Sequence, residues 1–122
     1  ENLYGKTKYL DPVKLANKYA AELKHEKGCD YVICLSNLGY EYSGSTVSDK
    51  VLAKSSEDID LILGGHSHTF LEQPTIVKNK KEKRVLIGQV GFGGVLLGRL
   101  DVYFERNKRG KCESCKNIVI KD

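Results

Sequence analysis

The sequence predicts a mixed α/β fold (α+β in its later part), in which a β-α-β unit is followed by antiparallel strands. Two short apolar runs, residues 31–35 (YVICL) and 59–63 (IDLIL), are typical of buried strands in a parallel sheet. The segment between them is long enough for the crossover that parallel pairing requires. After residue 70, short apolar runs alternate with turn signals, and this pattern favours antiparallel pairing.

Length and composition predict one soluble globular domain over residues 1–122, with 40% hydrophobic and 30% charged residues. No apolar run approaches the roughly 20 residues of a membrane span. Much of the net charge of +4 lies in residues 78–84 (KNKKEKR) and 106–111 (RNKRGK). Few aromatic residues accompany these lysines, so we interpret both clusters as solvated hairpin turns and predict no nucleic-acid partner.

The first predicted helix begins at Asp11-Pro12, with Asp as the N-cap and Pro at the first helical position. Positive charge in its last turn suits the helix dipole, and Gly28 ends the helix. His25 in that turn is expected to be an exposed helix-end residue without a functional role. The expected apolar stripe comprises Val13, Ala16, Tyr19, Ala20 and Leu23.

A second, short helix is expected after Thr46, because Thr46-x-x-Asp49 resembles a capping start. The later strands are expected at residues 74–77, 84–90, 97–104 and 117–120, with turns at NKKEK, GFGG and NKRGKCESC. The glycines near residue 91 do not form a dinucleotide-binding pattern, so tight turning is the favoured reason for them.

The four cysteines leave three interpretations open. Cys34 lies inside an apolar run, where a free cysteine behaves as a small hydrophobe, so inert thiols are favoured. The alternatives are a disulfide or redox pair between Cys112 and Cys115, or a metal site that adds Cys29 and Cys34.

Two loops carry the candidate functional residues. One holds Asn37 after the first parallel strand, and the other holds His66 and His68 after the second. Parallel strands end at the same edge of a sheet, where open α/β folds place their ligands. In an extended segment the side chains of His66 and His68 would point to the same side. Imidazole is a suitable ligand for Zn, Mn, Fe, Co or Ni, so the pair could bind a metal. The alternative is a pair of hydrogen-bonded loop histidines.

Four segments between residues 9 and 106 resemble the C-terminal half of the calcineurin-like metallophosphoesterase domain. They are DYVICLSNLGY, SDKVLA, IDLILGGHSHTFLEQP and VLIGQVGFGGVLLGRLDV. The G-H-x-H at residues 65–68 is the most specific element. Gln89-x-Gly91 and the LGRLD of residues 97–101 indicate the 5'-nucleotidase family within that superfamily.

This resemblance implies part of a four-layer αββα sandwich and a hydrolase of nucleotide phosphomonoesters. Such enzymes hold two divalent metals (Zn, Mn, Fe, Co or Mg), and His66 and His68 match one ligand of each. Asn37 stands where the family usually has a further histidine ligand. Members of this subgroup are commonly periplasmic or extracellular.

The chain departs from the family in lacking D-x-H, G-D-x-x-D and G-N-H-[DE], which supply the other ligands and the catalytic residues. No catalytic residue is therefore identified, and the isolated chain is expected to be inactive. A non-catalytic scaffold or binding module with a degenerate metal site is the alternative. We also expect the chain to bind its missing N-terminal half or to form a dimer, because a lone half exposes a sheet edge.

Overall fold

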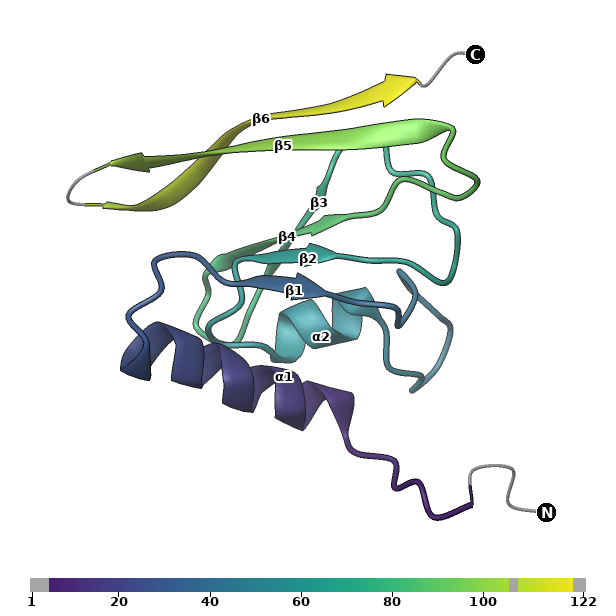
Figure 1. The fold of residues 1–122 in the computed structure, drawn as a ribbon, viewed down its shortest axis with the longest axis vertical. Helices are drawn as coiled ribbons and strands as arrows, with labels where there is room; N and C mark the ends of the chain where they lie inside the picture. Colours follow the sequence, from purple (N-terminus) through teal and green to yellow (C-terminus); the bar gives the residue numbers. More distant parts are fainter. Residues whose placement is uncertain (1–4, 106–107, 120–122) are drawn as a thin grey trace.

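The computed structural model describes residues 5–105 and 108–119 in three layers: helices, a four-stranded sheet and a two-stranded sheet (Figure 1). The helical layer comprises α1 (Pro12–Ala21), its π-helical continuation η1 (Glu22–Glu26) and α2 (Asp49–Ser55). The strands are β1 (Ile33–Leu35), β2 (Leu61–Leu63), β3 (Thr75–Lys78), β4 (Arg84–Gly88), β5 (Leu96–Glu105) and β6 (Lys108–Val119). In the described part of the chain, helices cover one outer face only, and the four-layer arrangement stays a prediction.

Helix α1 begins as predicted, because Asp11 Oδ1 accepts hydrogen bonds from the Val13 and Lys14 amides at 3.0 and 3.1 Å. Gly28, with φ +71°, follows the helical segment as expected. The predicted stripe was partly wrong, because Tyr19 and Leu23 are 55% and 39% exposed while Ala20 is buried. The face that packs on the core follows the spacing of Val13, Ala16 and Ala20, and Tyr19 lies about 100° away from Ala20 on the helix.

The N-cap of helix α2 lies two residues later than predicted. Ser48, not Thr46, is the N-cap, and its hydroxyl accepts from the Val51 amide at 3.3 Å. Asp49 is consequently the first helical residue, and it is fully buried. Leu52 and Ala53 then pack into the hydrophobic core.

The four-stranded sheet has the order β1-β2-β4-β3, and β1 pairs with β2 in parallel, as the β-α-β prediction requires. The expectation that β1 is buried on both faces was wrong. Ile33 and Leu35 are 51% and 80% exposed, whereas Leu61 and Ile62 of β2 are buried. Strand β1 lies at the edge of the sheet, and a continuous apolar run does not reveal whether a strand is central or at an edge.

Strand β4 was expected to have antiparallel neighbours, but it pairs in parallel with β2 and antiparallel only with β3. The 78–84 cluster forms the β3–β4 turn, as expected. Strands β5 and β6 form a hairpin across the face of the sheet opposite the helices (Figure 1). The expected turn at NKRGKCESC was wrong, because residues 108–119 form one strand that pairs with β5 through two register shifts.

The hydrophobic core lies between the helices and the four-stranded sheet, where Ile62, Val85 and Ile87 are fully buried. No helix within residues 5–105 and 108–119 is both long and apolar enough to cross a membrane.

Candidate functional site

Two loops meet at the carboxyl end of the sheet, as the sequence predicted. The Ser36 amide, just after β1, donates to the Leu63 carbonyl of β2 at 2.8 Å. The Tyr40 amide donates to Ser67 Oγ at 2.9 Å, which joins the first loop to the loop of the two histidines. A Cβ atom on residue 65 would lie 2.9 Å from Asn37 Oδ1, so the Asn37 amide packs directly on the Gly65 backbone. Asn37 and the histidine loop, defined as residues 64–69, are therefore neighbours.

The backbone of the histidine loop is not extended, which corrects the expectation that i and i+2 side chains share one side. His66 and His68 both have positive φ, 68° and 53°. Non-glycine residues rarely adopt this left-handed conformation, and such residues cluster at functional sites. Both imidazoles are exposed, and the ring of His68 stacks on Phe92 with centroids 4.9 Å apart.

The Gln89 side chain, at the end of β4, bonds to the histidine loop at three points. Its Oε1 accepts from the Thr69 amide at 2.5 Å and from Ser67 Oγ at 3.0 Å. Its Nε2 donates to the Gly65 carbonyl at 3.0 Å. Gln89 is only 3% exposed, and its three bonds to the half-buried loop residues are partly shielded from solvent. One buried amide thus contacts the loop before, between and after the two histidines.

Asp49 lies beneath the histidine loop and is fully buried. Its Oδ1 accepts a 2.5 Å hydrogen bond from Ser36 Oγ, but Oδ2 has no hydrogen-bond partner among the described residues. Burial raises the pKa of Asp49 above its usual range, and the Ser36 hydrogen bond only partly opposes this. Oδ2 is directed at Gly64, where any Cβ atom would collide with it.

Sequence reasoning missed the roles of Gln89, Ser67 and Asp49. Gln89 was noted only as part of the Q-x-G pattern, and Asp49 only as part of a capping signal. A polar residue directly after an apolar strand was the available signal for Gln89, since such a residue lies at the ligand-binding edge. Nothing local to Asp49 reveals that it will be buried.

The donor atoms of the described residues do not make a complete metal site. Two exposed imidazoles and the Asn37 amide are present, and the buried carboxylate of Asp49 is directed at the Gly64 backbone. Among the side chains that the structure describes (residues 5–104, 118 and 119), no group of three or more His, Cys, Asp or Glu residues could hold a metal ion. Catalytic metal sites normally use three protein ligands, so this chain would supply only part of one.

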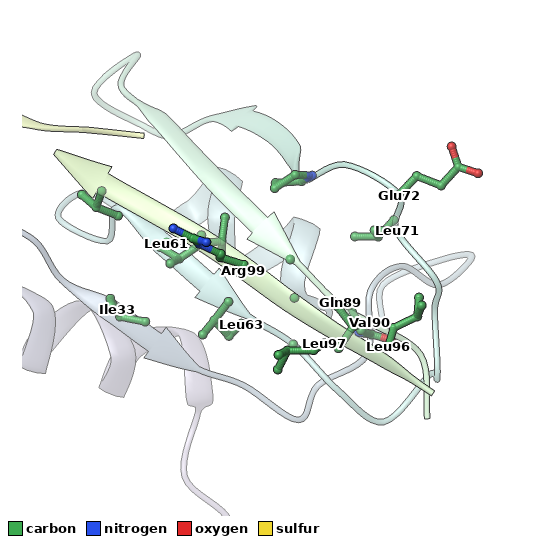
Figure 2. A pocket seen from close by; sticks show the side chains of 16 residues that line it. Ile33, Leu61, Leu63, Leu71, Glu72, Gln89, Val90, Leu96, Leu97 and Arg99 are labelled. Atoms are coloured by element: carbon green, nitrogen blue, oxygen red, sulfur yellow. The ribbon is translucent and has the colours of Figure 1, made fainter. Parts of the chain in front are cut away.

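A cavity of about 460 Å³ lies between the four-stranded sheet and β5. Figure 2 shows that aliphatic side chains line it, among them Leu61, Leu63 and Leu97. Arg99 and Gln89 are among its few polar lining residues, and Gln89 is already bonded to the histidine loop. The cavity is thus apolar space between two sheets, without the convergent polar groups of a substrate pocket.

Cys29 and Cys34 are free thiols that pack against the core, in agreement with the favoured interpretation. Burial, with a further contribution from the charge of Asp49, raises the pKa of Cys34, so its unreactive thiol form is favoured. The side chains of Cys112 and Cys115 lie outside the described residues, and the proposed pairing stays a prediction.

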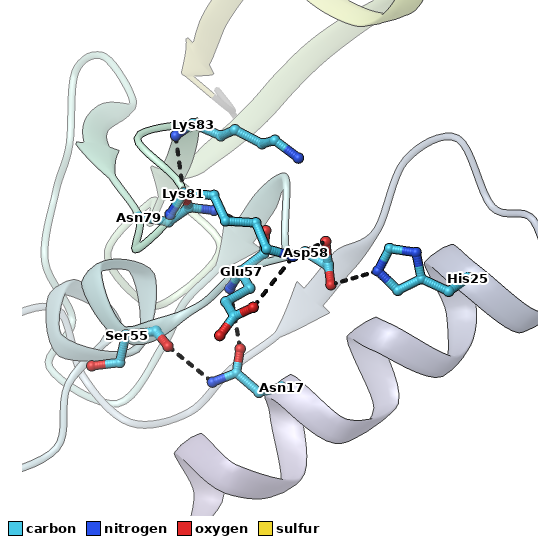
Figure 3. A network of polar contacts seen from close by, with 8 residues as sticks. All are labelled: Asn17, His25, Ser55, Glu57, Asp58, Asn79, Lys81 and Lys83. Atoms are coloured by element: carbon cyan, nitrogen blue, oxygen red, sulfur yellow. Dashed lines mark hydrogen bonds and ion pairs between the residues drawn. The ribbon is translucent and has the colours of Figure 1, made fainter.

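The amino end of the sheet carries a second polar network (Figure 3). His25 is 57% exposed, as expected, but its Nε2 lies 3.0 Å from Asp58 Oδ2. Lys81 Nζ lies 3.1 Å from Asp58 Oδ1. Burial alone would raise the pKa of Asp58, but the hydrogen bonds and charges of His25 and Lys81 outweigh it and lower the pKa below its usual range. His25 therefore ties the end of the first helical segment to the sheet.

No protein-family model matches this sequence. Individual relatives do match it. An apyrase from Aedes aegypti is 30% identical over 118 residues, which cover 83% of this chain and 20% of the apyrase. The trifunctional nucleotide phosphoesterase YfkN of Bacillus subtilis is 32% identical over 97 residues, which cover 80% of this chain and 6% of that protein.

Solved structures match over nearly the whole chain. A 5'-nucleotidase precursor from Thermus thermophilus superposes with a TM-score of 0.73 and 28% identity, covering 91% of this chain and 23% of that one. The NAD nucleotidase of Haemophilus influenzae has the same fold, with a TM-score of 0.75 and 24% identity over 93% of this chain and 24% of that one. The chain therefore spans about a quarter or less of these relatives' lengths. By sequence and by fold, this chain is homologous to one segment of the 5'-nucleotidase and apyrase family.

Proposed function

We propose that this chain is a segment of a metal-dependent hydrolase of nucleotide phosphoesters, to whose metal site it contributes His66 and His68. The observation that carries the proposal is the histidine loop: two exposed imidazoles in left-handed backbone at the carboxyl end of parallel strands. The names of the relatives, among them apyrase and 5'-nucleotidase, support nucleotides as the substrate class.

The isolated chain is expected to be inactive, because its donor set is incomplete. We expect no phosphate release from AMP, ADP or nitrophenyl phosphate in the presence of Mn²⁺ or Zn²⁺. Turnover that His68→Ala abolishes would show that the chain is an enzyme by itself and would overturn this part of the proposal.

Metal binding by the chain tests the role of the two histidines directly. The sequence contains three histidines, so their imidazole NMR signals can be followed separately during a Zn²⁺ titration. We expect the signals of His66 and His68 to shift together and that of His25 to stay unchanged. His66→Ala should leave a response at His68, because the resemblance assigns the two histidines to different metals, and His25→Ala is the matched control that should leave both responses intact.

A second candidate is a non-catalytic binding module that kept the fold. Asn37, at a position where the resemblance implies a histidine ligand, favours it. If neither His66 nor His68 responds to Zn²⁺, Mn²⁺ or Co²⁺, the first proposal fails and this second function is favoured.

The exposed edge of the sheet supports the expected association with another chain. Ile33 and Leu35 lie exposed on edge strand β1, and Ile33 lines the apolar cavity (Figure 2). We expect the remaining part of the hydrolase to cover this edge, and in its absence a second copy of the chain to do so. Light scattering should show a dimer that Leu35→Lys weakens. Leu10→Lys, at another exposed leucine, is the control, and a monomeric wild-type chain would contradict the expectation.

A further inference from the structure

We propose that Gln89 is a positioning residue that holds His66 and His68 in their left-handed conformation before any ligand arrives. The importance of the loop rests on the proposed function, but the positioning itself concerns the ligand-free chain. Gln89 is 21 residues beyond His68 in the sequence, and it reaches the loop because β4 pairs in parallel with β2.

The positions of the three bonds carry the inference. The Gly65 carbonyl directly precedes His66, Ser67 separates the two histidines, and the Thr69 amide directly follows His68. Each histidine is therefore flanked on both sides by a group bonded to the same buried side chain. A left-handed conformation is unfavourable for these residues, and it persists where the surrounding contacts enforce it.

The chemistry of the partners requires an amide at position 89. The Thr69 N–H can only donate, so an oxygen must face it, and the Gly65 carbonyl can only accept, so an N–H must face it. Glutamate would set a second acceptor against the Gly65 carbonyl, and methionine would offer neither a strong donor nor a strong acceptor. Leaving these half-buried loop groups unpaired carries a desolvation cost, so either substitution should release the loop.

Ser67 connects Gln89 to the neighbouring loop, which carries Asn37 and Tyr40. Its hydroxyl donates to Gln89 Oε1 and accepts from the Tyr40 amide, and it lies 2.8 Å from Thr69 Oγ1. Gln89 is thereby linked through one serine to the segment that carries Asn37. The geometry of all three candidate ligands thus depends on one buried side chain.

The test compares Gln89→Glu and Gln89→Met with Gln73→Glu, a control at an exposed glutamine. A positive φ gives a strong intraresidue amide-to-Hα NOE. We expect this signal at His66 and His68 in the wild-type chain and in the Gln73 control. Both Gln89 variants should lose it while the NOEs between β1 and β2 show that the fold is intact. A folded Gln89 variant in which both histidines keep the signal would overturn the proposal.

A second measurement needs no variant, in case the substitutions prevent folding. The Gln89 side-chain NH₂ should exchange with solvent at least tenfold more slowly than that of Gln73, because it is buried and donates to Gly65. Equal exchange rates would overturn the proposal.

Zinc affinity separates the failure of this inference from failure of the proposed function. If the loop is preorganised for metal, Gln89→Met should weaken Zn²⁺ binding about tenfold, the lower range for residues that support metal ligands. If His66 and His68 do not bind Zn²⁺ in the wild-type chain but lose their positive φ in the Gln89 variants, the proposed function fails and the positioning role stands. If His66 and His68 bind Zn²⁺ in the wild-type chain and keep their positive φ in folded Gln89 variants, the positioning role fails and the proposed function stands.

Discussion

The two ends of the four-stranded sheet each bury one carboxylate and one amide side chain, and they satisfy them in different ways. At the amino end, Asp58 has two side-chain partners, His25 and Lys81 (Figure 3). At the carboxyl end, Asp49 receives only a hydroxyl hydrogen bond, and its second oxygen has no partner within the described residues. The pKa of Asp58 is accordingly lowered and that of Asp49 is raised.

The two amides differ only in part in the range of their contacts, because Asn79 Nδ2 also donates to the Glu57 carbonyl, 22 residues away, at 3.1 Å. Asn79 Oδ1 accepts from the Lys81 and Lys83 amides at 2.9 and 3.0 Å, within its own turn. The partners of Gln89 lie 20 to 24 residues away along the chain. The amino end thus compensates its buried carboxylate, and one residue of its turn, Glu82, has a positive φ of 57°. The carboxyl end combines a poorly compensated carboxylate with a positive φ at both histidines. Proteins accept such local strain mainly at functional sites, which favours the carboxyl end as the place of function.

Gly64→Ala, at the carboxyl end of the sheet, should lower the free energy of unfolding more than any other substitution considered below. The new Cβ atom would collide with Asp49 Oδ2 and lie 3.0 Å from its Cγ and 3.1 Å from Gln89 Nε2. Asp49 is buried at the start of a helix and has little room to move, so we expect the free energy of unfolding to fall by about 3 kcal/mol in urea denaturation.

The matched control is Gly88→Ala, whose Cβ would make only ordinary contacts at 3.5 and 3.9 Å. Combining Gly64→Ala with Asp49→Ala should restore part of the lost stability, because the colliding oxygen is removed. Equal losses for the Gly64 and Gly88 variants would contradict the packing argument.

Asp58→Asn tests the charge compensation at the amino end. It removes the negative charge that faces His25 and Lys81 but keeps the size of the side chain. Both partners are partly exposed, so we expect a loss of about 1.5 kcal/mol in the free energy of unfolding at pH 7. Asp30→Asn, at an exposed carboxylate, is the control and should change stability by less than about 0.5 kcal/mol.

The pH dependence of that loss follows from the lowered pKa of Asp58. As pH falls below about 4, the unfolded chain takes up a proton on this group before the folded chain does, so the stabilisation declines. The difference between wild type and Asp58→Asn should therefore shrink below pH 4. A difference that stays constant from pH 7 to pH 3 would mean that the ion pairs do not cause it.

How much the sequence could predict also differs between the two ends. The residues of the Asn79 turn lie within five positions of one another, so the NKKEK pattern predicted the turn. The shared edge of Asn37 and the histidines followed from two apolar runs and the rules of parallel pairing. The hydrogen bonds between Gln89 and the histidine loop depend on β4 lying beside β2. The exposure of Leu35 depends on β1 having a neighbouring strand on one side only. These are long-range properties, and no local pattern in the sequence encodes them.

Asp49→Asn should have the smallest effect, and it should have the opposite sign to Asp58→Asn. The asparagine can still accept from Ser36 Oγ, and it removes the cost of burying a charge whose Oδ2 finds no donor in the described structure. A group whose pKa is raised on folding favours the folded state below its unfolded pKa, and this contribution is lost as pH rises. The variant should therefore match wild type near pH 3.5 and exceed it by about 0.5–1 kcal/mol at pH 7. Asp11→Asn is the control, because asparagine caps helices as well as aspartate does. A variant less stable than wild type at pH 7 would show that the charge of Asp49 is compensated, and the contrast between the two ends of the sheet would then not hold.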